Sequence, residues 1–489
     1  MTTTTTALPT PPRAAPPRSW IWLALGALLV FASNLRWGVG ALAWIAPVPW
    51  LYYLRTTRGW RSRLALGGTA MLAWTFATAK IVSAPLPMWF ALLGIVFGLI
   101  QTAGYVLADR LRRRAGALAS VAIFPAVMVV LEWAQGRFTG LATWAAAGYT
   151  QLDDLPLLQL ASIAGLGAIS FIVYAVAAAG ELALASALDR APARRSIAIL
   201  AGTIAIAGAA HVWGAIRMSE DLGDTTRVAA IGTIATFFPD TPMTAADRAQ
   251  ILDALDADTV AAARAGAKLA VWTEAAAIAT PDEEPALIAR ARAIAQRGHL
   301  HVVAAYVVPG APRFQNKYVW VRPDGTIDHT YWKHHPAPGE PAVVGDAALT
   351  AIDADDTKMS GAICYDYDFP TMAAEHGALD VDLVAVPSSD WRGIDPIHTQ
   401  MAAIRAIEQG FSIVRSTRFG LSAGIDPHGR LRAWRSSFDT PERVMLVDLP
   451  RHGSATIYRR VGDLWILACA AFVALALTTS WRARSSRTS

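Results

Sequence analysis

The first 216 residues contain seven apolar stretches that are long enough, or nearly long enough, to cross a lipid bilayer as helices. An eighth stretch lies near the C-terminus, at about residues 463–481. Backbone groups inside a bilayer must find hydrogen-bond partners within the protein, so we expect these stretches to be helical. The first seven fall at about residues 19–35, 38–54, 64–83, 88–108, 115–135, 157–187 and 196–216. The sequence therefore predicts a membrane α-helical bundle with eight spans.

The composition agrees with a membrane protein, because 54% of the residues are hydrophobic and only 17% are charged. The net charge of +5 comes largely from arginine clusters between the apolar stretches, a pattern that indicates membrane topology rather than nucleic-acid binding. The chain has two cysteines, Cys364 in a polar region and Cys469 in the last apolar stretch, which argues against a disulfide framework.

Four segments follow from this pattern. Residues 1–18 are rich in Thr, Pro and Ala and predict a disordered cytoplasmic tail. Residues 19–219 form a transmembrane domain of seven helices, and residues 220–455 alternate short β-rich runs with amphipathic stretches, which indicates a layered α/β domain. Residues 456–489 supply the last transmembrane helix and a basic tail.

Basic residues are retained on the cytoplasmic side of a membrane. Arginine clusters follow the second, fourth and sixth apolar stretches, and arginines also flank both termini. With the N-terminus inside, seven spans place residues 220–455 outside the cytoplasm. The three clusters are Arg55, Arg58, Arg61 and Arg63; Arg110 and Arg112 to Arg114; and Arg190, Arg194 and Arg195.

Within the α/β domain we expect strands and helices to alternate. The expected strands are 227–235, 268–272, 301–308, 316–325, 359–364 and 383–387, and the expected helices include 244–266 and 396–410.

Cys364 ends an apolar strand in GAICYDYDFP, where a sharp turn would present its thiol. Such a turn also directs the next backbone N–H, that of Tyr365, toward an oxyanion. The alternative is a buried cysteine that acts as a small hydrophobic residue.

Three further residues have side chains suited to acid–base work. Glu274 follows a strand in VWTEAA and is either a general base or a residue of a helix N-terminal turn. Lys333 lies among aromatic residues and is either a group that stabilises an oxyanion or a solvated loop lysine. Glu340, in the same loop, can position either of them or be exposed. His334 and His335 lack a carboxylate or thiol at ligand spacing, so neither a metal nor a cofactor is expected.

The order Glu274, Lys333, Cys364 resembles the nitrilase superfamily of carbon–nitrogen hydrolases, over about residues 225–450. WTEAA, YWKHHPAPGE and GAICYDYDFP are similar to its glutamate, lysine and cysteine motifs, and 398–431 resembles the region that follows. The resemblance implies a four-layer α-β-β-α sandwich and acyl transfer through a thioester. The same resemblance implies that Glu274 transfers protons, that Lys333 stabilises the oxyanion and that Glu340 is a supporting acid.

Seven spans, an external nitrilase-like domain and one closing span resemble the apolipoprotein N-acyltransferase family, and residues 143–173 are similar to a signature of that family. The resemblance implies a bacterial cell-membrane enzyme that moves an acyl chain from a phospholipid to the N-terminal amine of a diacylglyceryl-modified apolipoprotein.

Some positions depart from that family. Asp366 stands where glutamate is usual, CYDYDFP is closer to soluble amidases, and TRFG at 417–420 replaces an asparagine-containing turn. Asp366 is expected to support the site without acting as the base. Two alternatives stay open: a membrane-tethered amidase or acyltransferase with another acceptor, and a non-catalytic domain that binds lipid or protein.

Overall fold

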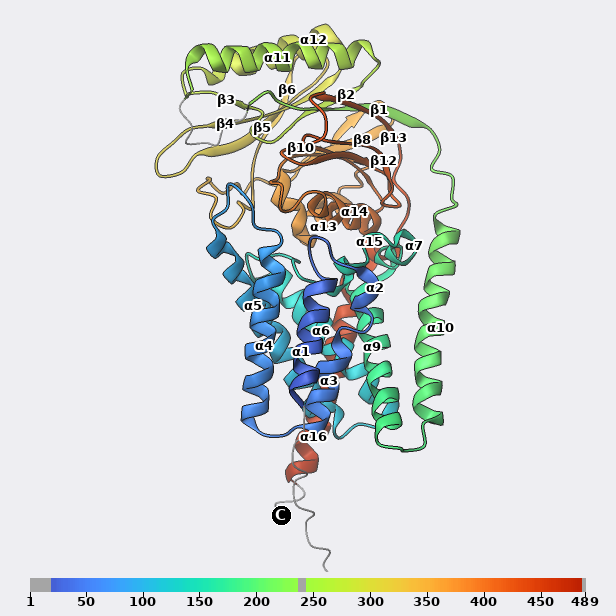
Figure 1. The fold of residues 1–489 in the computed structure, drawn as a ribbon. Helices are drawn as coiled ribbons and strands as arrows, with labels where there is room; N and C mark the ends of the chain where they lie inside the picture. The colour runs from blue at the N-terminus through green and yellow to red at the C-terminus, as the bar shows by residue number, and fades with distance from the viewer. Residues whose placement is uncertain (1–18, 236–242, 486–489) are drawn as a thin grey trace, which may run out of the picture.

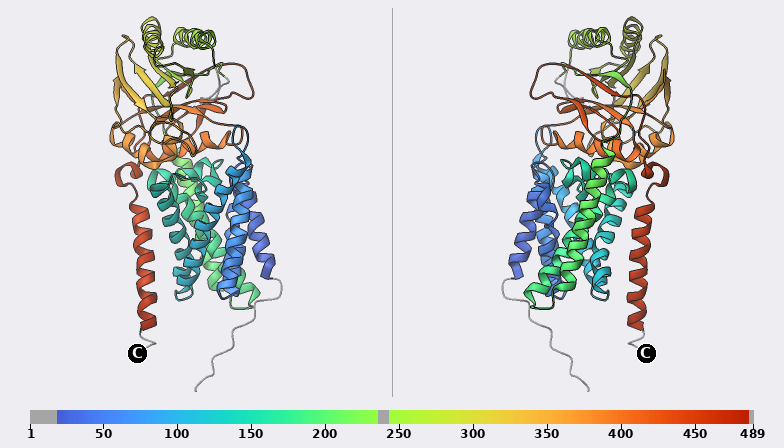
Figure 2. Two further views of the ribbon diagram at one scale, coloured as in Figure 1. Left: turned by 90° about the vertical axis from the view of Figure 1, so that its left-hand side faces the viewer. Right: turned by 90° about the vertical axis from the view of Figure 1, so that its right-hand side faces the viewer.

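The computed structural model describes residues 19–235 and 243–485, without the side chains from Ser480 onward. Long helices run side by side in one half of the molecule, and two β-sheets with their own helices form the other half (Figure 1). Two side views show the same division, with α16 running along the helical half (Figure 2). The tail predicted at residues 1–18 lies outside the described residues.

The helical half contains short and long helices. Among the described residues, four helical segments are long and apolar enough to cross a membrane: Met88–Arg112, Ala117–Phe138, Leu166–Leu188 and Arg194–Arg217. The elements of this half are α1 (Ser19–Ser33), α2 (Gly40–Ala43), α3 (Pro47–Thr56), α4 (Trp60–Ala79), η1 (Met88–Leu92), α5 (Leu93–Arg112), α6 (Ala117–Phe138), η2 (Ala147–Gln151), α7 (Leu155–Leu158), α8 (Ala161–Ala164), α9 (Leu166–Leu188), α10 (Arg194–Arg217), α15 (Ile457–Val461) and α16 (Leu464–Ser485).

Two of the expected apolar stretches are not single helices. Residues 157–187 contain the end of α7 and the whole of α8 before α9 begins, and the last break comes at Gly165, which has φ +70°. A Cβ at Gly165 would lie 2.7 Å from Cε2 of Tyr458, so close packing requires glycine there. Residues 38–54 divide into α2 and α3, which begins with Pro47. Hydrophobicity alone does not reveal these breaks, because both sides of each break are apolar.

The α/β half contains a seven-stranded and a six-stranded sheet. In the first, β1, β2 and β4 are parallel neighbours, with β3 also pairing β4; in the second, β8, β9 and β10 are parallel neighbours. The first contains β1 (Thr225–Ile231), β2 (Leu269–Trp272), β3 (Ala277–Ile278), β4 (His301–Val308), β5 (Gln315–Val321), β6 (Ile327–Trp332) and β13 (Val444–Pro450). The second contains β7 (Ile352–Ala354), β8 (Thr357–Gly361), β9 (Leu383–Ser389), β10 (Ser412–Arg418), β11 (Leu421–Ile425) and β12 (Leu431–Ser436).

Helices cover the outer faces of the two sheets (Figure 1). Over the seven-stranded sheet lie α11 (Ala245–Arg264) and α12 (Glu284–Gly298), with an apolar core of their own. Between the six-stranded sheet and the helical half lie α13 (Pro370–Ala378) and α14 (Ile397–Gln409). A second apolar core continues from between the sheets into the helical half. The catalytic candidates therefore lie in a domain that packs directly on the helices.

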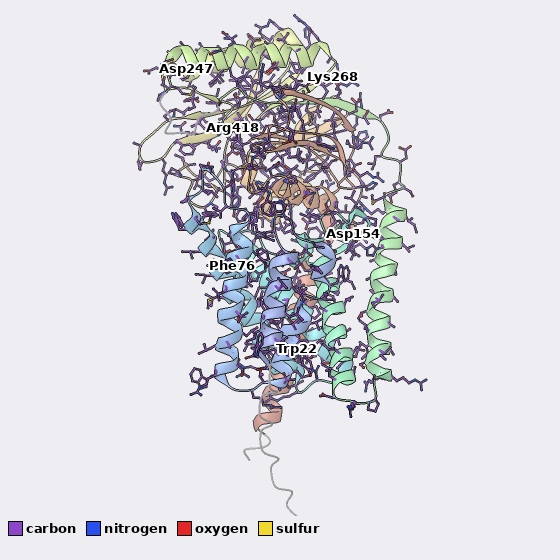
Figure 3. The ribbon with its side chains drawn as sticks, in the orientation of Figure 1. Trp22, Phe76, Asp154, Asp247, Lys268 and Arg418 are labelled. Atoms are coloured by element: carbon purple, nitrogen blue, oxygen red, sulfur yellow. The ribbon has the colours of Figure 1, made fainter. Side chains whose placement is uncertain are left out.

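The two sheets meet near the carboxyl ends of their parallel strands. The backbone N–H of Glu274, just after β2, donates to the carbonyl of Ser388 in β9 over 3.2 Å. Figure 3 places the side chain of Arg418, at the end of β10, within this α/β half and Asp154 at the junction with the helices. Loops at the carboxyl ends of parallel strands are a common place for ligands in α/β proteins.

Candidate active site

Cys364 occupies a strained turn between β8 and the short 3₁₀ helix η3 (Cys364–Asp368). Its φ of +48° is rare for a residue with a side chain, and such strain persists where the surrounding structure enforces it. The residue is only 4% exposed, and its thiol donates to the carbonyl oxygen of Ser389 over 3.6 Å. The turn therefore holds the sulfur at the ends of β8 and β9.

Glu274, Lys333 and Glu340 form one connected group. Nζ of Lys333 donates to Oε1 of Glu274 over 2.8 Å and to Oε2 of Glu340 over 2.7 Å. Glu274 follows β2 by two residues, and Lys333 directly follows β6, so strand ends fix both backbones. The structure thus brings together three residues that lie 66 positions apart at most in the sequence.

Asn316 on β5 completes this group, which we call the lysine cluster (Glu274, Asn316, Lys333 and Glu340). Its Nδ2 donates to Oε1 of Glu274 over 2.7 Å and to Oε1 of Glu340 over 2.9 Å. The backbone N–H of Ala337 also donates to Glu340, over 2.8 Å. Sequence reasoning missed Asn316, because an asparagine within a strand carries no motif.

The charges in this cluster set the protonation states of its cation and of the nearby thiol. Burial lowers the pKa of Lys333, but the carboxylates of Glu274 and Glu340 outweigh it and hold that pKa well above its usual range. Burial, together with the charge of Glu274, raises the pKa of Cys364 well above that of an ordinary thiol. Lys333 is therefore charged, and Cys364 keeps its proton until a base removes it.

Asp366 joins the nucleophile loop to the lysine loop. Its carboxylate accepts the backbone N–H of Ile363 over 2.9 Å, the hydroxyl of Tyr331 over 2.8 Å and the backbone N–H of His335 over 2.7 Å. A fully buried carboxylate with three donors is suited to holding loops. The side chain of Tyr365 reaches the helical half, where its hydroxyl donates to the carbonyl of Gly140 over 2.9 Å.

A second charged group lies beside Cys364, and we call Asp368, Asp390, His398 and Arg415 the histidine cluster. The ring nitrogens of His398 lie 2.7 Å from Oδ1 of Asp390 and 2.8 Å from Oδ1 of Asp368. Arg415 donates to both oxygens of Asp390 over 3.0 Å. All four residues are buried.

Mutual attraction keeps the histidine cluster ionised. Burial lowers the pKa of His398, but Asp368 and Asp390 outweigh it and raise that pKa to about 9. Burial also opposes ionisation of Asp390, yet Arg415 and His398 together hold its pKa below the usual range. Sequence reasoning missed this cluster, although Arg415, a charged residue inside the apolar strand SIVRS, is a signal that could have indicated a buried ion pair.

Two groups of side chains are of the kinds that bind metal ions. Ligand atoms of Cys364, Asp390 and His398 lie within 4.8 Å of one another. Both ring nitrogens of His398 and both oxygens of Asp390 already contact partners within the histidine cluster. These contacts explain why the groups lie together without a metal ion. Elsewhere, His335 stacks on Phe369 with ring centroids 4.0 Å apart.

Comparison with known proteins finds matches for both halves of the chain. Residues 25–179 match the model of the apolipoprotein N-acyltransferase N-terminal domain, and residues 227–457 match the carbon-nitrogen hydrolase model. The chain is 29% identical over 440 residues to the apolipoprotein N-acyltransferase of Bradyrhizobium diazoefficiens, covering 81% of this chain and 79% of the relative. It is 25% identical over 517 residues to that of Geobacter metallireducens, covering 96% and 97%.

The chain belongs to the apolipoprotein N-acyltransferase family. It is accordingly a membrane protein and an acyltransferase of the nitrilase superfamily. Among solved structures, an amidase from Nesterenkonia sp. aligns with a TM-score of 0.40 and 21% identity, covering 47% of this chain and 92% of the amidase.

Proposed function

We propose that this family member transfers an acyl chain from a phospholipid, through a thioester on Cys364, to the N-terminal amine of a diacylglyceryl-modified apolipoprotein. The observation that carries the proposal is the contact of 2.8 Å between Glu274 and Lys333 beside the buried thiol of Cys364, in a chain that matches the acyltransferase family along both halves. Glu274, Lys333 and Cys364 are the proposed catalytic residues.

The first step forms the thioester. Glu274 accepts the thiol proton as Sγ of Cys364 attacks the ester carbonyl carbon, and Lys333 with the Tyr365 N–H stabilises the oxyanion. The S–C bond forms, the C–O bond to glycerol breaks, and the proton held by Glu274 passes to the departing glycerol oxygen. Because the thiol pKa is raised, proton transfer and attack must be coupled.

The second step releases the product. The amine of the acceptor attacks the thioester carbon, Glu274 takes one proton from the nitrogen, and Lys333 again stabilises the oxyanion. The N–C bond forms, the C–S bond breaks, and Glu274 returns the proton to the sulfur. Glu340, Asp366 and the side chain of Tyr365 support this site by holding Lys333 and the two loops.

The proposed architecture is the predicted one: a four-layer α-β-β-α domain between seven spans and one closing span. We propose that α1, α2 with α3, α4 and α16 cross the membrane together with the four longer segments. The connection between α9 and α10 contains Arg190 and leads into Arg194 and Arg195, the first residues of α10; it lies at the end of the bundle away from the sheets (Figure 1). This supports an extracytoplasmic catalytic domain, because arginine-rich connections are retained in the cytoplasm.

The proposed acyl donor and acceptor both carry acyl chains that are anchored in the membrane. An enzyme embedded in the membrane can bind both without transferring either acyl chain into water.

The test is direct observation of both steps. Purified full-length protein in phospholipid nanodiscs should gain the mass of one acyl chain at Cys364 and lose it when a synthetic diacylglyceryl-cysteine lipopeptide is added. Cys364→Ser should not turn over, whereas Cys469→Ser should behave as the parent chain. Hydrolysis of a simple amide without transfer to the lipopeptide would instead favour an amidase, the alternative that Asp366 suggests.

Orientation needs a separate test. In Cys469→Ser, Cys364 is the one remaining cysteine. We expect a membrane-impermeant thiol reagent added outside cells to modify it slowly, after local opening of the site. Modification solely from the cytoplasmic side would overturn the proposed topology.

A further inference from the structure

His398 lies next to the nucleophile but has no part in the steps above. It is the second residue of α14, it is 3% exposed, and its ring lies between carboxylates from two different segments. Asp368 ends the 3₁₀ helix that begins with Cys364, and Asp390 directly follows β9. One imidazole thus links the segment that carries the thiol to the strand whose Ser389 carbonyl accepts it.

The geometry defines the charge of this ring. A neutral imidazole has one N–H, yet both nitrogens of His398 face a carboxylate oxygen at 2.7 and 2.8 Å. When the ring of His398 is an imidazolium, the histidine cluster contains two positive groups, on His398 and Arg415, and two carboxylates. Nη2 of Arg415 lies 2.9 Å from Nδ1, and its positive charge opposes this state.

The cluster also reaches the helical half. Nε1 of Trp144 donates to Oδ2 of Asp368 over 2.6 Å, and the hydroxyl of Thr143 donates to its backbone carbonyl over 3.0 Å. The ring of Trp144 lies over His398 with centroids 5.8 Å apart. The same carboxylate therefore contacts both His398 and the loop that follows α6.

We propose that His398, as an imidazolium between Asp368 and Asp390, is a positioning residue that holds the nucleophile turn against β9 and balances the charge beside the thiol of Cys364. The proposal rests on the proposed function only in taking Cys364 as the nucleophile. The sulfur of Cys364, a carboxylate oxygen of Asp390 and a ring nitrogen of His398 lie within 4.8 Å of one another, and Asp390 raises the pKa of Cys364 while Arg415 lowers it, so the charges of this cluster act on the sulfur.

The charge balance predicts opposite effects for two substitutions. His398→Gln leaves one uncompensated negative charge near the sulfur and should disfavour the thiolate. Asp368→Asn leaves one uncompensated positive charge and should favour it. The double variant restores neutrality. Loss of packing alone would change all three variants in the same direction.

The experiment measures alkylation of Cys364 by iodoacetamide against pH, with Cys469→Ser as the parent chain and intact mass as the readout. This measurement needs neither lipid donor nor lipopeptide, so its outcome is distinct from that of the acyl-transfer test. At pH 8 we expect His398→Gln to react about fivefold to tenfold more slowly, Asp368→Asn several-fold faster, and the double variant within about twofold of the parent. His211→Gln, which removes a histidine 2.7 Å from Asp154 in the helical half, is the matched control and should match the parent.

If His398→Gln does not fold, the pH profile of Asp368→Asn decides the matter. Charge balance predicts alkylation that is faster and shifted to lower pH, whereas looser packing would speed alkylation without moving the profile. An unchanged rate in His398→Gln, or equal slowing in all three variants with no movement of the pH profile, would overturn the proposal.

Discussion

The lysine cluster and the histidine cluster both lie near Cys364, and they differ in charge. The lysine cluster has two carboxylates for one ammonium, with Asn316 as a neutral donor. The histidine cluster has two carboxylates for two cations, provided that His398 is protonated. The lysine cluster therefore has a net negative charge, which suits it to accept a proton. The histidine cluster has no net charge, so its groups tend to keep their protonation states.

The clusters also differ in their surroundings. The side chain of Glu340 is 17% exposed, whereas those of Asp390 and Arg415 are at most 1% exposed. The lysine cluster is built from strand ends of the seven-stranded sheet and the loop after β6, while the histidine cluster joins the six-stranded sheet to the helical half. We infer that one cluster carries out chemistry and the other keeps the nucleophile in place.

The strongest test removes the charges of the lysine cluster. Lys333→Ala and Glu274→Gln should each lower kcat/KM for transfer to lipopeptide by at least about a thousandfold, because members of one catalytic unit fail together. Lys317→Ala is the matched control, because Lys317 is also a buried lysine. Its ammonium pairs with Glu284, which lies outside this cluster, at a distance of 2.6 Å. Near-normal turnover in either cluster variant would remove that residue from the mechanism.

The next test concerns the stability of the histidine cluster. The pKa of His398 is about 9, against about 6.5 in an unfolded chain, so its ion pairs should contribute at most about 3 kcal/mol to the free energy of unfolding. Because the folded pKa is raised, this contribution is fully present below pH 6.5 and is lost as the pH rises through 9. The thermal midpoint of the parent should exceed that of His398→Gln at pH 6, and the gap should narrow by pH 9.5. A gap that does not depend on pH would mean that His398 is neutral.

Asp366 connects the nucleophile turn to the loop that contains Lys333, since its carboxylate accepts backbone N–H groups from Ile363 and His335. Asp366→Glu adds a methylene to a fully buried side chain and should cost about 1–3 kcal/mol if the surroundings cannot adjust. In a true lipoprotein acyltransferase, transfer to the amine should persist or change modestly, while an amidase-like site should lose activity. Transfer that is undetectable in both parent and variant, alongside amide hydrolysis, would contradict the proposed function.

The smallest effect is expected at the contact with the helical half. Trp144→Phe keeps an aromatic ring but removes the indole N–H that binds Asp368, which should cost about 1 kcal/mol in stability and lower kcat a few-fold with little change in KM. Trp434→Phe, at a tryptophan that is 63% exposed, is the control. A change in KM alone would indicate that Trp144 contacts substrate and does not position Asp368.

Much of the fold follows from local sequence patterns. The helix expected at 244–266 is α11, Ala245–Arg264, and the strand expected at 383–387 lies within β9, Leu383–Ser389. These elements are defined by periodicity and by end signals such as Thr244, which caps α11. Motif order was enough to predict Glu274, Lys333, Glu340 and Cys364 as site residues, and their roles remain predictions.

The tertiary structure alone decided which charges meet. Asn316 on β5, Asp390 after β9 and His398 on α14 were not predicted as site residues, and they join the site because folding brings these distant segments together. The break at Gly165 depends likewise on Tyr458, which lies almost 300 residues later. Hydrophobic pattern and motif order are properties of neighbouring residues, so they were enough to predict the apolar stretches, six of the thirteen described strands and Cys364 as a site residue. Charge balance in a buried site depends on pairs of groups brought together by folding, and only the folded chain shows those pairs.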